Sequence, residues 1–223
     1  MFFKKQKNYE EPRLDIVTAN SSFELKEAYN ALVTKLLQFP IENKCKKIAV
    51  TSAIYGEGKT SVAINLAVTL AANLVDKKIL LIDADMRSSH VASFLDLNSN
   101  VSGIGLSDYL AEKVEDVNVI ASLLPNLSVI PAGGASFNPS GLILSNKMSK
   151  LLSECEENFD YIIIDTPPAT FVSDAILLSD RVDGYVISTR AKYSVISKIA
   201  SVEQALTSAG ATIFGMILTD SKK

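Results

Sequence analysis

Short apolar runs that end in polar, Gly or Pro residues recur along this chain and predict the strands of a sheet. Six such runs are rich in β-branched residues, at 47–52, 78–83, 127–131, 161–165, 184–188 and 212–219. Because the runs are continuous rather than alternating, they are typical of strands buried on both faces, as in a parallel sheet. Helical patterns lie between them at about 59–75, 140–157, 173–180 and 193–209. This alternation predicts an α/β fold: a doubly wound, mainly parallel sheet with helices on both faces.

One amphipathic helix is predicted ahead of the first strand. Ser21-Ser-Phe-Glu24 has the spacing of a capping box, and apolar residues then recur at helical intervals until Phe39-Pro40 ends the pattern. The apolar residues of this face are Phe23, Ala28, Leu32, Leu36 and Leu37. The helix either packs on an outer face of its own domain, which is the commoner arrangement, or serves a neighbouring subunit.

The chain of 223 residues has room for one large domain. Residues 1–20 have no clear periodicity, so we expect a flexible N-terminal arm there and a single domain over 21–223. The segment 96–126 mixes Asn, Ser, Gly and acidic residues around a short helix near 107–113. This composition indicates an insertion over the edge of the sheet.

Composition and charge narrow the class of protein. Apolar residues make up 48% and charged residues 21%, which is enough for a sizeable core and excludes disorder over most of the chain. The formal net charge of −3 gives no indication of a nucleic-acid partner. Two cysteines, Cys45 and Cys155, and one histidine are too few for a disulfide framework or a His-rich metal site. No secretory signal follows the N-terminal lysines, and the weakly polar stretch 61–75 is too short to span a bilayer, so we expect a soluble, cytoplasmic protein.

The strongest chemical signal is a phosphate-binding loop after the first predicted strand. Ala53-Ile-Tyr-Gly-Glu-Gly-Lys-Thr60 differs from G-x-x-x-x-G-K-[ST] only at its first residue, and it opens a predicted helix. The glycines let the backbone curl so that its N–H groups surround phosphates, and the helix N-terminus adds positive charge. Lys59 would reach the β- and γ-phosphates, and the Thr60 hydroxyl would ligate Mg²⁺. The predicted nucleotide-binding set is Tyr55, Gly56, Glu57, Gly58, Lys59, Thr60 and Ser61.

Three aspartates follow two further predicted strands. Asp83 and Asp85 are two residues apart, which puts both carboxylates on the same side of an extended chain. Asp165 ends the apolar run that begins at Tyr161, as a Walker B aspartate does. Ligands bind at the carboxyl ends of strands in α/β sheets, and three carboxylates beside a triphosphate repel one another unless a divalent cation intervenes. The three acids therefore predict Mg²⁺ as well as a nucleotide.

Two arginines are further candidates. Arg87 lies two residues beyond Asp85 and either contacts a phosphate or holds its loop through a salt bridge; both alternatives stay open. Arg190 follows the fifth predicted strand and either joins the nucleotide-binding set or is a solvated charge. The lone His90 has no assigned role.

Over residues of about 21–220, these motifs resemble the bacterial tyrosine kinases (BY-kinases), cytoplasmic P-loop proteins of capsule and exopolysaccharide production. The matching segments are Ser52-Ala-Ile-Tyr-Gly-Glu-Gly-Lys-Thr60 (Walker A), Leu81-Ile-Asp-Ala-Asp-Met-Arg87 (Walker A′) and Ile162-Ile-Ile-Asp-Thr-Pro-Pro168 (Walker B), with Ile130-Pro-Ala-Gly133 and Asn138-Pro-Ser140 between them. The related partitioning and division-site ATPases carry a signature lysine early in the loop. Ile54 stands at that position here, which favours the kinase family.

The resemblance implies an ATP-dependent protein-tyrosine kinase that uses Mg²⁺. Lys59 would stabilise the transferring phosphoryl group, Asp83 would orient or deprotonate the tyrosine hydroxyl, and Asp85 would arrange the metal and its waters. With Arg87, these residues form the expected catalytic set. Thr60, Asp83 and Asp165 would hold Mg²⁺. Catalysis would then be mainly positioning and charge stabilisation.

Three features depart from the family pattern. The C-terminal tyrosine cluster, the usual autophosphorylation target, is missing, since the last tyrosine is Tyr193. The first-helix motif Glu-x-x-Arg-x-x-Arg, which links subunits into a ring, survives only as Glu27, with Asn30 and Val33 at the arginine positions. The loss of two guanidinium groups argues against a ring built that way, and a homo-oligomer of another kind stays open. Thr219 stands where the family has an asparagine near the adenine.

We therefore expect an autophosphorylating kinase of protein tyrosines that regulates polysaccharide synthesis or export. The alternative is a P-loop ATPase switch that controls a membrane polysaccharide-assembly partner without tyrosine phosphorylation. A scaffold without nucleotide chemistry is disfavoured, because the phosphate-binding and acidic residues are all present. The resemblance also implies a membrane-bound co-polymerase or activator with a cytoplasmic tail, which would bring the protein to the inner face of the membrane. Lys4, Lys5 and Lys7 add weak attraction to anionic lipid or are simply solvated.

Overall fold

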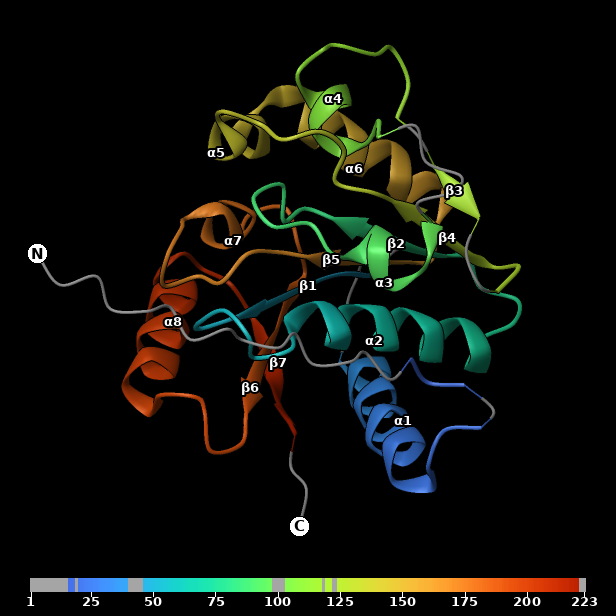
Figure 1. Cartoon of the computed structure of the whole chain (residues 1–223), viewed down its shortest axis with the longest axis vertical. Coiled ribbons are helices and arrows are strands. Elements are labelled where there is room, and N and C mark those ends of the chain that lie inside the picture. Colours follow the sequence, from blue (N-terminus) through green and yellow to red (C-terminus); the bar gives the residue numbers. More distant parts are fainter. Residues whose placement is uncertain are drawn as a thin grey trace, which may run out of the picture.

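One sheet organises the computed structural model, which describes residues 16–18, 20–39, 46–97, 103–117, 119–121 and 124–220 (Figure 1). Within these residues the strands are β1 (Lys46–Ser52), β2 (Ile79–Asp83), β3 (Ile120–Ala121), β4 (Leu127–Ile130), β5 (Tyr161–Asp165), β6 (Gly184–Arg190) and β7 (Ile213–Thr219). Their order across the sheet is β3-β4-β2-β5-β1-β6-β7. All neighbouring pairs are parallel except β3 with β4. The doubly wound, mainly parallel sheet that the apolar runs predict is confirmed.

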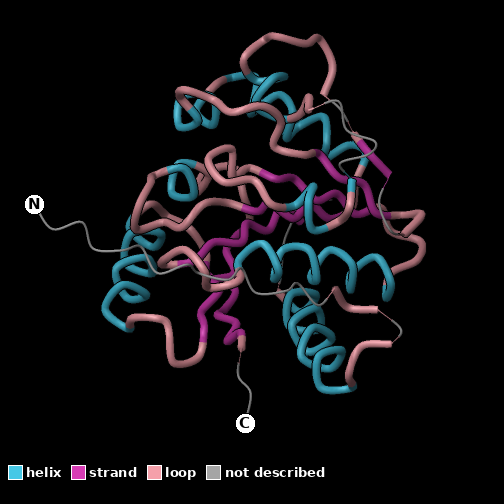
Figure 2. The backbone as a smooth tube through the Cα atoms, in the orientation of Figure 1, coloured by secondary structure: helices cyan, strands magenta, loops and turns pink. Residues whose placement is uncertain are grey.

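Helices cover both faces of this sheet (Figures 1 and 2). They are α1 (Phe23–Gln38), α2 (Lys59–Asn73), α3 (Val91–Phe94), α4 (Leu106–Leu110), α5 (Pro139–Leu144), α6 (Asn146–Asn158), α7 (Asp174–Leu177) and α8 (Ile196–Ser208). On one face, α2 packs its apolar side chains against the central strands, and α1 packs on the outside of α2. On the other face, α4, α5 and α6 cover β2, β4 and β5, while α8 covers β1 and β6. The central strands are thus buried on both sides, as their continuous apolar runs require.

The first helix packs on its own domain, as the commoner arrangement predicts. Its buried residues are Tyr29, Val33 and Leu36. The predicted apolar face was therefore partly wrong, because Phe23 is 71% exposed and Leu37 is 40% exposed. Polar contacts with α2 fix this rotation: the side-chain amide of Asn65 donates to Tyr29 Oη at 3.4 Å, and that of Asn73 donates to Asn30 Oδ1 at 2.9 Å.

The region expected to be one helix over 140–157 is two helices, α5 and α6. Ser145 separates them, and its hydroxyl accepts a hydrogen bond from the Met148 N–H at 3.2 Å, as an N-cap does. In the expected insertion, α4 and the two-residue strand β3 are described, and β3 lies at the edge of the sheet. Neither β3 nor the short helix α3 was predicted.

The first described residues lie against the domain. The Val17 N–H donates to Asn65 Oδ1 on α2 at 2.7 Å. The expected arm up to residue 15, with Lys4, Lys5 and Lys7, lies outside the described residues, as does Cys45. Among the helices of the described ranges, none is both long and apolar enough to cross a bilayer.

Candidate active site

The topology of the sheet brings the predicted motifs to one point. Strand β5 lies between β1 and β2. The P-loop follows β1, the Asp83 segment ends β2, and Asp83 pairs in register with Asp165 at the end of β5. The order of the central strands therefore places all three motifs side by side at the carboxyl edge, where parallel sheets bind ligands.

The P-loop turns through two left-handed glycines. Gly56 and Gly58 both have φ of +81°, a conformation that side chains with a Cβ rarely adopt. Gly58 is the N-cap of α2, so the first N–H groups of this long helix have no partner within the helix and are available to a ligand in the loop. Beside Gly56, a Cβ would lie 3.2 Å from Tyr193 Oη. Both the conformation and the crowding explain why this loop needs glycine.

Glu57 holds the loop in shape from inside. Its side chain is fully buried, and one carboxylate oxygen accepts the N–H groups of Ala53 at 2.7 Å and Ile54 at 2.8 Å. The other oxygen accepts a hydrogen bond from the Ser194 hydroxyl. The Glu57 carbonyl in turn accepts bonds from the hydroxyls of Ser188 at 2.6 Å and Thr219 at 3.0 Å. The carboxylate of Glu57 is therefore engaged with protein groups, which leaves only its backbone to face a phosphate.

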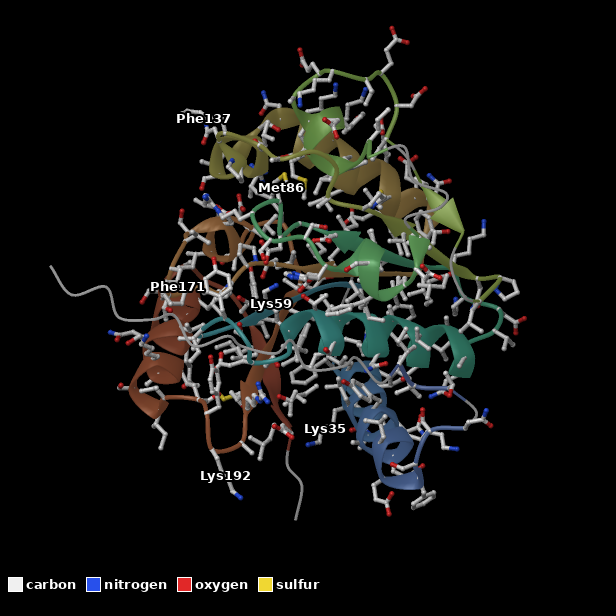
Figure 3. All side chains as sticks on the ribbon, in the orientation of Figure 1. Lys35, Lys59, Met86, Phe137, Phe171 and Lys192 are labelled. Carbon is white, nitrogen blue, oxygen red and sulfur yellow. The ribbon has the colours of Figure 1, made fainter. Side chains whose placement is uncertain are left out.

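Lys59 lies among the acidic side chains at the first turn of α2, near the middle of the molecule (Figure 3). Its Nζ is 2.7 Å from Asp85 Oδ2 and 3.8 Å from Asp165 Oδ1. Thr60 donates its hydroxyl to Asp165 Oδ2 at 2.7 Å. These side chains are buried, so the attraction between them is screened far less than it is at the surface.

Asp83 completes the acidic group. Its Oδ1 accepts the Asp85 N–H at 3.1 Å, and its Oδ2 accepts the Ser89 hydroxyl at 2.8 Å and the Val91 N–H at 3.3 Å. Burial, followed by the nearby negative charge of Asp165, raises the pKa of Asp83 to about 7. Such a carboxyl group is suited to exchange protons near neutral pH.

The remaining charges respond to the same surroundings. Burial raises the pKa of Asp165, although Lys59 and the Thr60 hydroxyl oppose this shift. Burial alone would lower the pKa of Lys59, but Asp165 and Asp85 outweigh it and the pKa is raised. Lys59 therefore stays protonated.

The residues present fit a divalent cation bound together with phosphate. Within the described part of the chain, Asp165 Oδ1 accepts no hydrogen bond and lies 3.8 Å from Lys59 Nζ, while the only partner of Asp85 Oδ2 is the same ammonium group, at 2.7 Å. One ammonium group does not balance three buried carboxylates, and such an acidic group attracts a further cation. Among the described residues, no three acidic, His or Cys side chains form a metal cage alone. Mg²⁺ suits such a site, because it is usually bound by one or two carboxylates plus phosphates and water.

Arg87 takes the salt-bridge alternative. Its Nε donates to Asp174 Oδ2 at 2.8 Å and its Nη2 to Asp174 Oδ1 at 3.1 Å. The hydrogen bond to Asp174 is also the main reason why the pKa of Arg87 is raised. Arg87 is thus near the site but faces a carboxylate on α7.

The other predicted residues surround the outer end of the loop. Arg190 donates to Asp220 Oδ2 from Nη2 at 3.0 Å and to the Gly56 carbonyl from Nη1 at 3.3 Å. Tyr55 is half-exposed, and its ring lies 5.1 Å from the ring of Phe171 between centroids. Ser61 follows Thr60 in the first turn of α2.

Sequence reasoning missed three residues that support this site: Ser89, Ser140 and Asp174. Ser89 bonds to Asp83 from the same loop, so a short-range pattern could have indicated it. Ser140 and Asp174 reach Arg87 from helices far away in the chain. Ser140 lies in the matching segment Asn138-Pro-Ser140 without an assigned role, and Asp174 had no signal beyond its position at a helix start.

Several tyrosine-protein kinases are similar to this chain. A family model described as an AAA domain matches residues 45–205. The tyrosine-protein kinase CpsD of Streptococcus agalactiae is 32% identical over 209 residues, which cover 92% of this chain and 89% of that protein. The tyrosine-protein kinase YwqD of Bacillus subtilis is 33% identical over 199 residues, covering 88% and 81%. The kinase domain of the Escherichia coli tyrosine kinase ETK superposes with a TM-score of 0.82 at 29% identity, covering 99% of this chain and 87% of that one.

The span that superposes on the ETK kinase domain covers 99% of this chain and so includes the P-loop and the acidic group. The chain belongs to the bacterial tyrosine-kinase family, as its motifs predicted.

Proposed function

We propose that this protein transfers the γ-phosphoryl group of ATP to a protein tyrosine in the presence of Mg²⁺. The observation that carries the proposal is the meeting of Lys59, Asp85 and Asp165 within 3.8 Å at the P-loop, with Asp83 alongside. A phosphate cradle, one buried ammonium group and clustered acids are the parts that phosphoryl transfer requires.

In this mechanism the chain supplies position and charge. The P-loop N–H groups hold the phosphates, and Lys59 leaves Asp85 in part to stabilise the negative charge that develops on the transferring group. Thr60, Asp83 and Asp165 would hold Mg²⁺, which would neutralise phosphate charge when bound. Asp83 orients the acceptor hydroxyl and takes its proton.

The biological setting of the proposal follows the family. The kinase acts in capsular or exopolysaccharide biosynthesis, in the cytoplasm, together with a membrane-bound activator whose cytoplasmic tail it meets. Its substrates are tyrosines of proteins. Among the described tyrosines of the chain itself, Tyr55 has the most exposed side chain.

The test is a kinase assay on the purified full chain with Mg·ATP, a tyrosine-containing protein substrate and the tail of the membrane partner. Phosphotyrosine is expected with the wild-type chain and is lost in Lys59→Met and Asp83→Asn. Phosphotyrosine formation at the wild-type level in both variants would contradict the proposed roles. ADP formation without any phosphotyrosine, even with the tail added, would favour the ATPase switch instead.

A further inference from the structure

A buried carboxylate on α7 has no part in the roles assigned so far. Asp174 is 1% exposed and is the first residue of that helix. Its two oxygens accept the Arg87 guanidinium as a fork, at 2.8 and 3.1 Å. Ser140 adds a third bond, donating its hydroxyl to Asp174 Oδ1 at 2.5 Å. A bidentate arginine–carboxylate pair is among the strongest and most directional contacts that a protein makes.

These three residues come from three segments that each follow a strand of the sheet. Arg87 lies in the loop after β2, Ser140 in the first turn of α5 beyond β4, and Asp174 beyond the loop that follows β5. Met86, the neighbour of Arg87, is buried in the core that contains α4 and α6, and Figure 3 shows it between the sheet and these upper helices. A single carboxylate therefore ties together the segments that border the acidic group.

The contacts lead from Asp174 to the phosphoryl-transfer site in two steps. The Arg87 N–H donates to Asp85 Oδ1 at 3.3 Å, and the Ser88 N–H donates to the same oxygen at 3.0 Å. The other oxygen of Asp85 lies 2.7 Å from Lys59 Nζ. The Arg87 side chain thus anchors the backbone turn that aims Asp85 at Lys59.

We propose that Asp174 and Ser140 are positioning residues for phosphoryl transfer, which act by holding Arg87 and with it the turn that orients Asp85. This inference rests on the proposed function. Asp174 and Ser140 contact neither the P-loop glycines nor Thr60. Their loss therefore disturbs the geometry of phosphoryl transfer more than it weakens the binding of nucleotide.

The experiment compares Asp174→Asn, Ser140→Ala and Arg87→Gln in the full chain, measured as kcat and KM for Mg·ATP and as affinity for a fluorescent ADP analogue. We expect kcat to fall about 10- to 100-fold in Asp174→Asn, the range found when residues that orient functional groups are lost. KM and ADP affinity should change less than about threefold. Ser140→Ala removes the two hydrogen bonds that its hydroxyl makes with Asp174 and Arg87 but keeps the ion pair, so it should lower kcat less, and Ser140→Thr should restore kcat.

Two controls separate a positioning role from a merely structural one. Asp180→Asn makes the same change at a nearby carboxylate that is 77% exposed, and its kcat should equal that of the wild type. The double variant Arg87→Gln/Asp174→Asn should be no slower than the slower single variant, because both act through one contact. The proposal would be overturned if the losses of kcat in the two single variants multiplied in the double variant. It would also be overturned if Asp174→Asn raised KM at unchanged kcat, or if its kcat equalled that of Asp180→Asn.

Both ADP release and phosphotyrosine are measured for every variant. A wild-type chain that forms ADP but no phosphotyrosine would refute the kinase proposal and still allow the Asp174 effect to be read from ADP release. If Asp174→Asn does not fold, Ser140→Ala becomes the deciding variant, since it keeps the charge pair intact. If Ser140→Ala and Ser140→Thr both kept the kcat of the wild type, the role of Ser140 would be refuted, and with it the proposed action of Asp174 and Ser140 through Arg87.

Discussion

At the Lys59 end of the P-loop, three buried carboxylates share one nearby ammonium group, and Asp165 Oδ1 accepts no hydrogen bond within the described residues. At the Gly56 end, the polar groups are matched by protein partners. Glu57 receives three donors on its carboxylate, and Arg190 bonds to both Asp220 and the loop backbone. The two ends of one short loop therefore differ in how far the protein satisfies its own polar atoms.

This difference separates the part of the site that acts on a ligand from the part that keeps the loop in shape. Charge left uncompensated by the protein is costly unless something else compensates it, so the Lys59 end is where a phosphate and a cation gain the most. The satisfied Gly56 end gives rigidity, which keeps the N–H groups in place before a ligand arrives. Variants at the first end should affect rate, and variants at the second end should affect stability.

The largest effect is expected for Lys59→Met. Without its ammonium group the phosphoryl group loses a preorganised positive charge, so kcat/KM should fall on the order of 10³-fold, the upper range for one such group. The measurement is phosphotyrosine formation under Mg·ATP. Lys77→Met serves as the matched control, because Lys77 pairs with Asp160 at a half-exposed position just beyond the far end of α2. A comparable loss in both variants would remove the distinction between the two regions.

Asp83→Asn should lower kcat by about 10²-fold, at the lower end for loss of a general base, and should also change the pH dependence of stability. A carboxyl whose pKa is raised from 3.8 to about 7 binds more protons in the folded chain than in the unfolded one. Its stabilising contribution is present below about pH 4 and is lost as the pH rises through 7. Without nucleotide and Mg²⁺, the melting temperature of the wild type should fall more steeply between pH 5 and pH 8 than that of Asp83→Asn. Parallel curves would contradict the raised pKa.

At the satisfied end, Glu57→Gln should lower the free energy of unfolding by about 1–3 kcal/mol, because a neutral amide weakens the hydrogen bonds that the carboxylate accepts from Ala53, Ile54 and Ser194. Urea unfolding measures this change. Glu154→Gln on the exposed side of α6 is the control and should have little effect. A Glu57→Gln chain of wild-type stability with impaired phosphotransfer alone would place Glu57 in the chemistry instead.

The smallest effect is expected for Arg190→Ala. Its pair with Asp220 is partly exposed, so the loss of stability should stay below about 1 kcal/mol and should shrink in high salt. Thermal unfolding at low and high ionic strength checks both points. A loss of several kcal/mol that salt does not alter would show that the outer end depends on this arginine more than its exposure indicates.

Most of the fold could be predicted from the sequence because strands buried on both faces leave continuous apolar runs. The P-loop was equally accessible, since its glycines, lysine and threonine must stand at fixed spacing. The alignment of Asp83 with Asp165 also follows, because both end strands that are neighbours at the centre of the sheet.

The missing elements depend on partners that are far apart in the chain. Strand β3 has only two residues and is formed by antiparallel pairing with β4, so no local sequence pattern indicates it. The buried face of α1 includes Tyr29, whose hydroxyl accepts a hydrogen bond from Asn65 on α2, and excludes the predicted Phe23 and Leu37. Arg87 showed the same limit: its two alternatives could be separated only once α7 brought Asp174 to it.

Asp174 also shows what a helix-start residue can conceal. An acidic residue in the first turn of a helix has a local explanation, since it balances the helix dipole. Here its partners are an arginine 87 residues away and a serine 34 residues away. A local explanation for a residue therefore does not exclude a distant one.

The span matched by the family model, 45–205, is shorter than the cooperative unit that the packing defines. Trimming the chain to that span would remove Val33 and Leu36 from the core and expose apolar side chains of α2 to solvent. It would also delete β7, and with it the Thr219 hydroxyl that donates a hydrogen bond to the Glu57 carbonyl. A fragment cut at those limits would keep the P-loop and the three aspartates but expose apolar surface, so biochemical work on this kinase needs the flanking helix and the last strand.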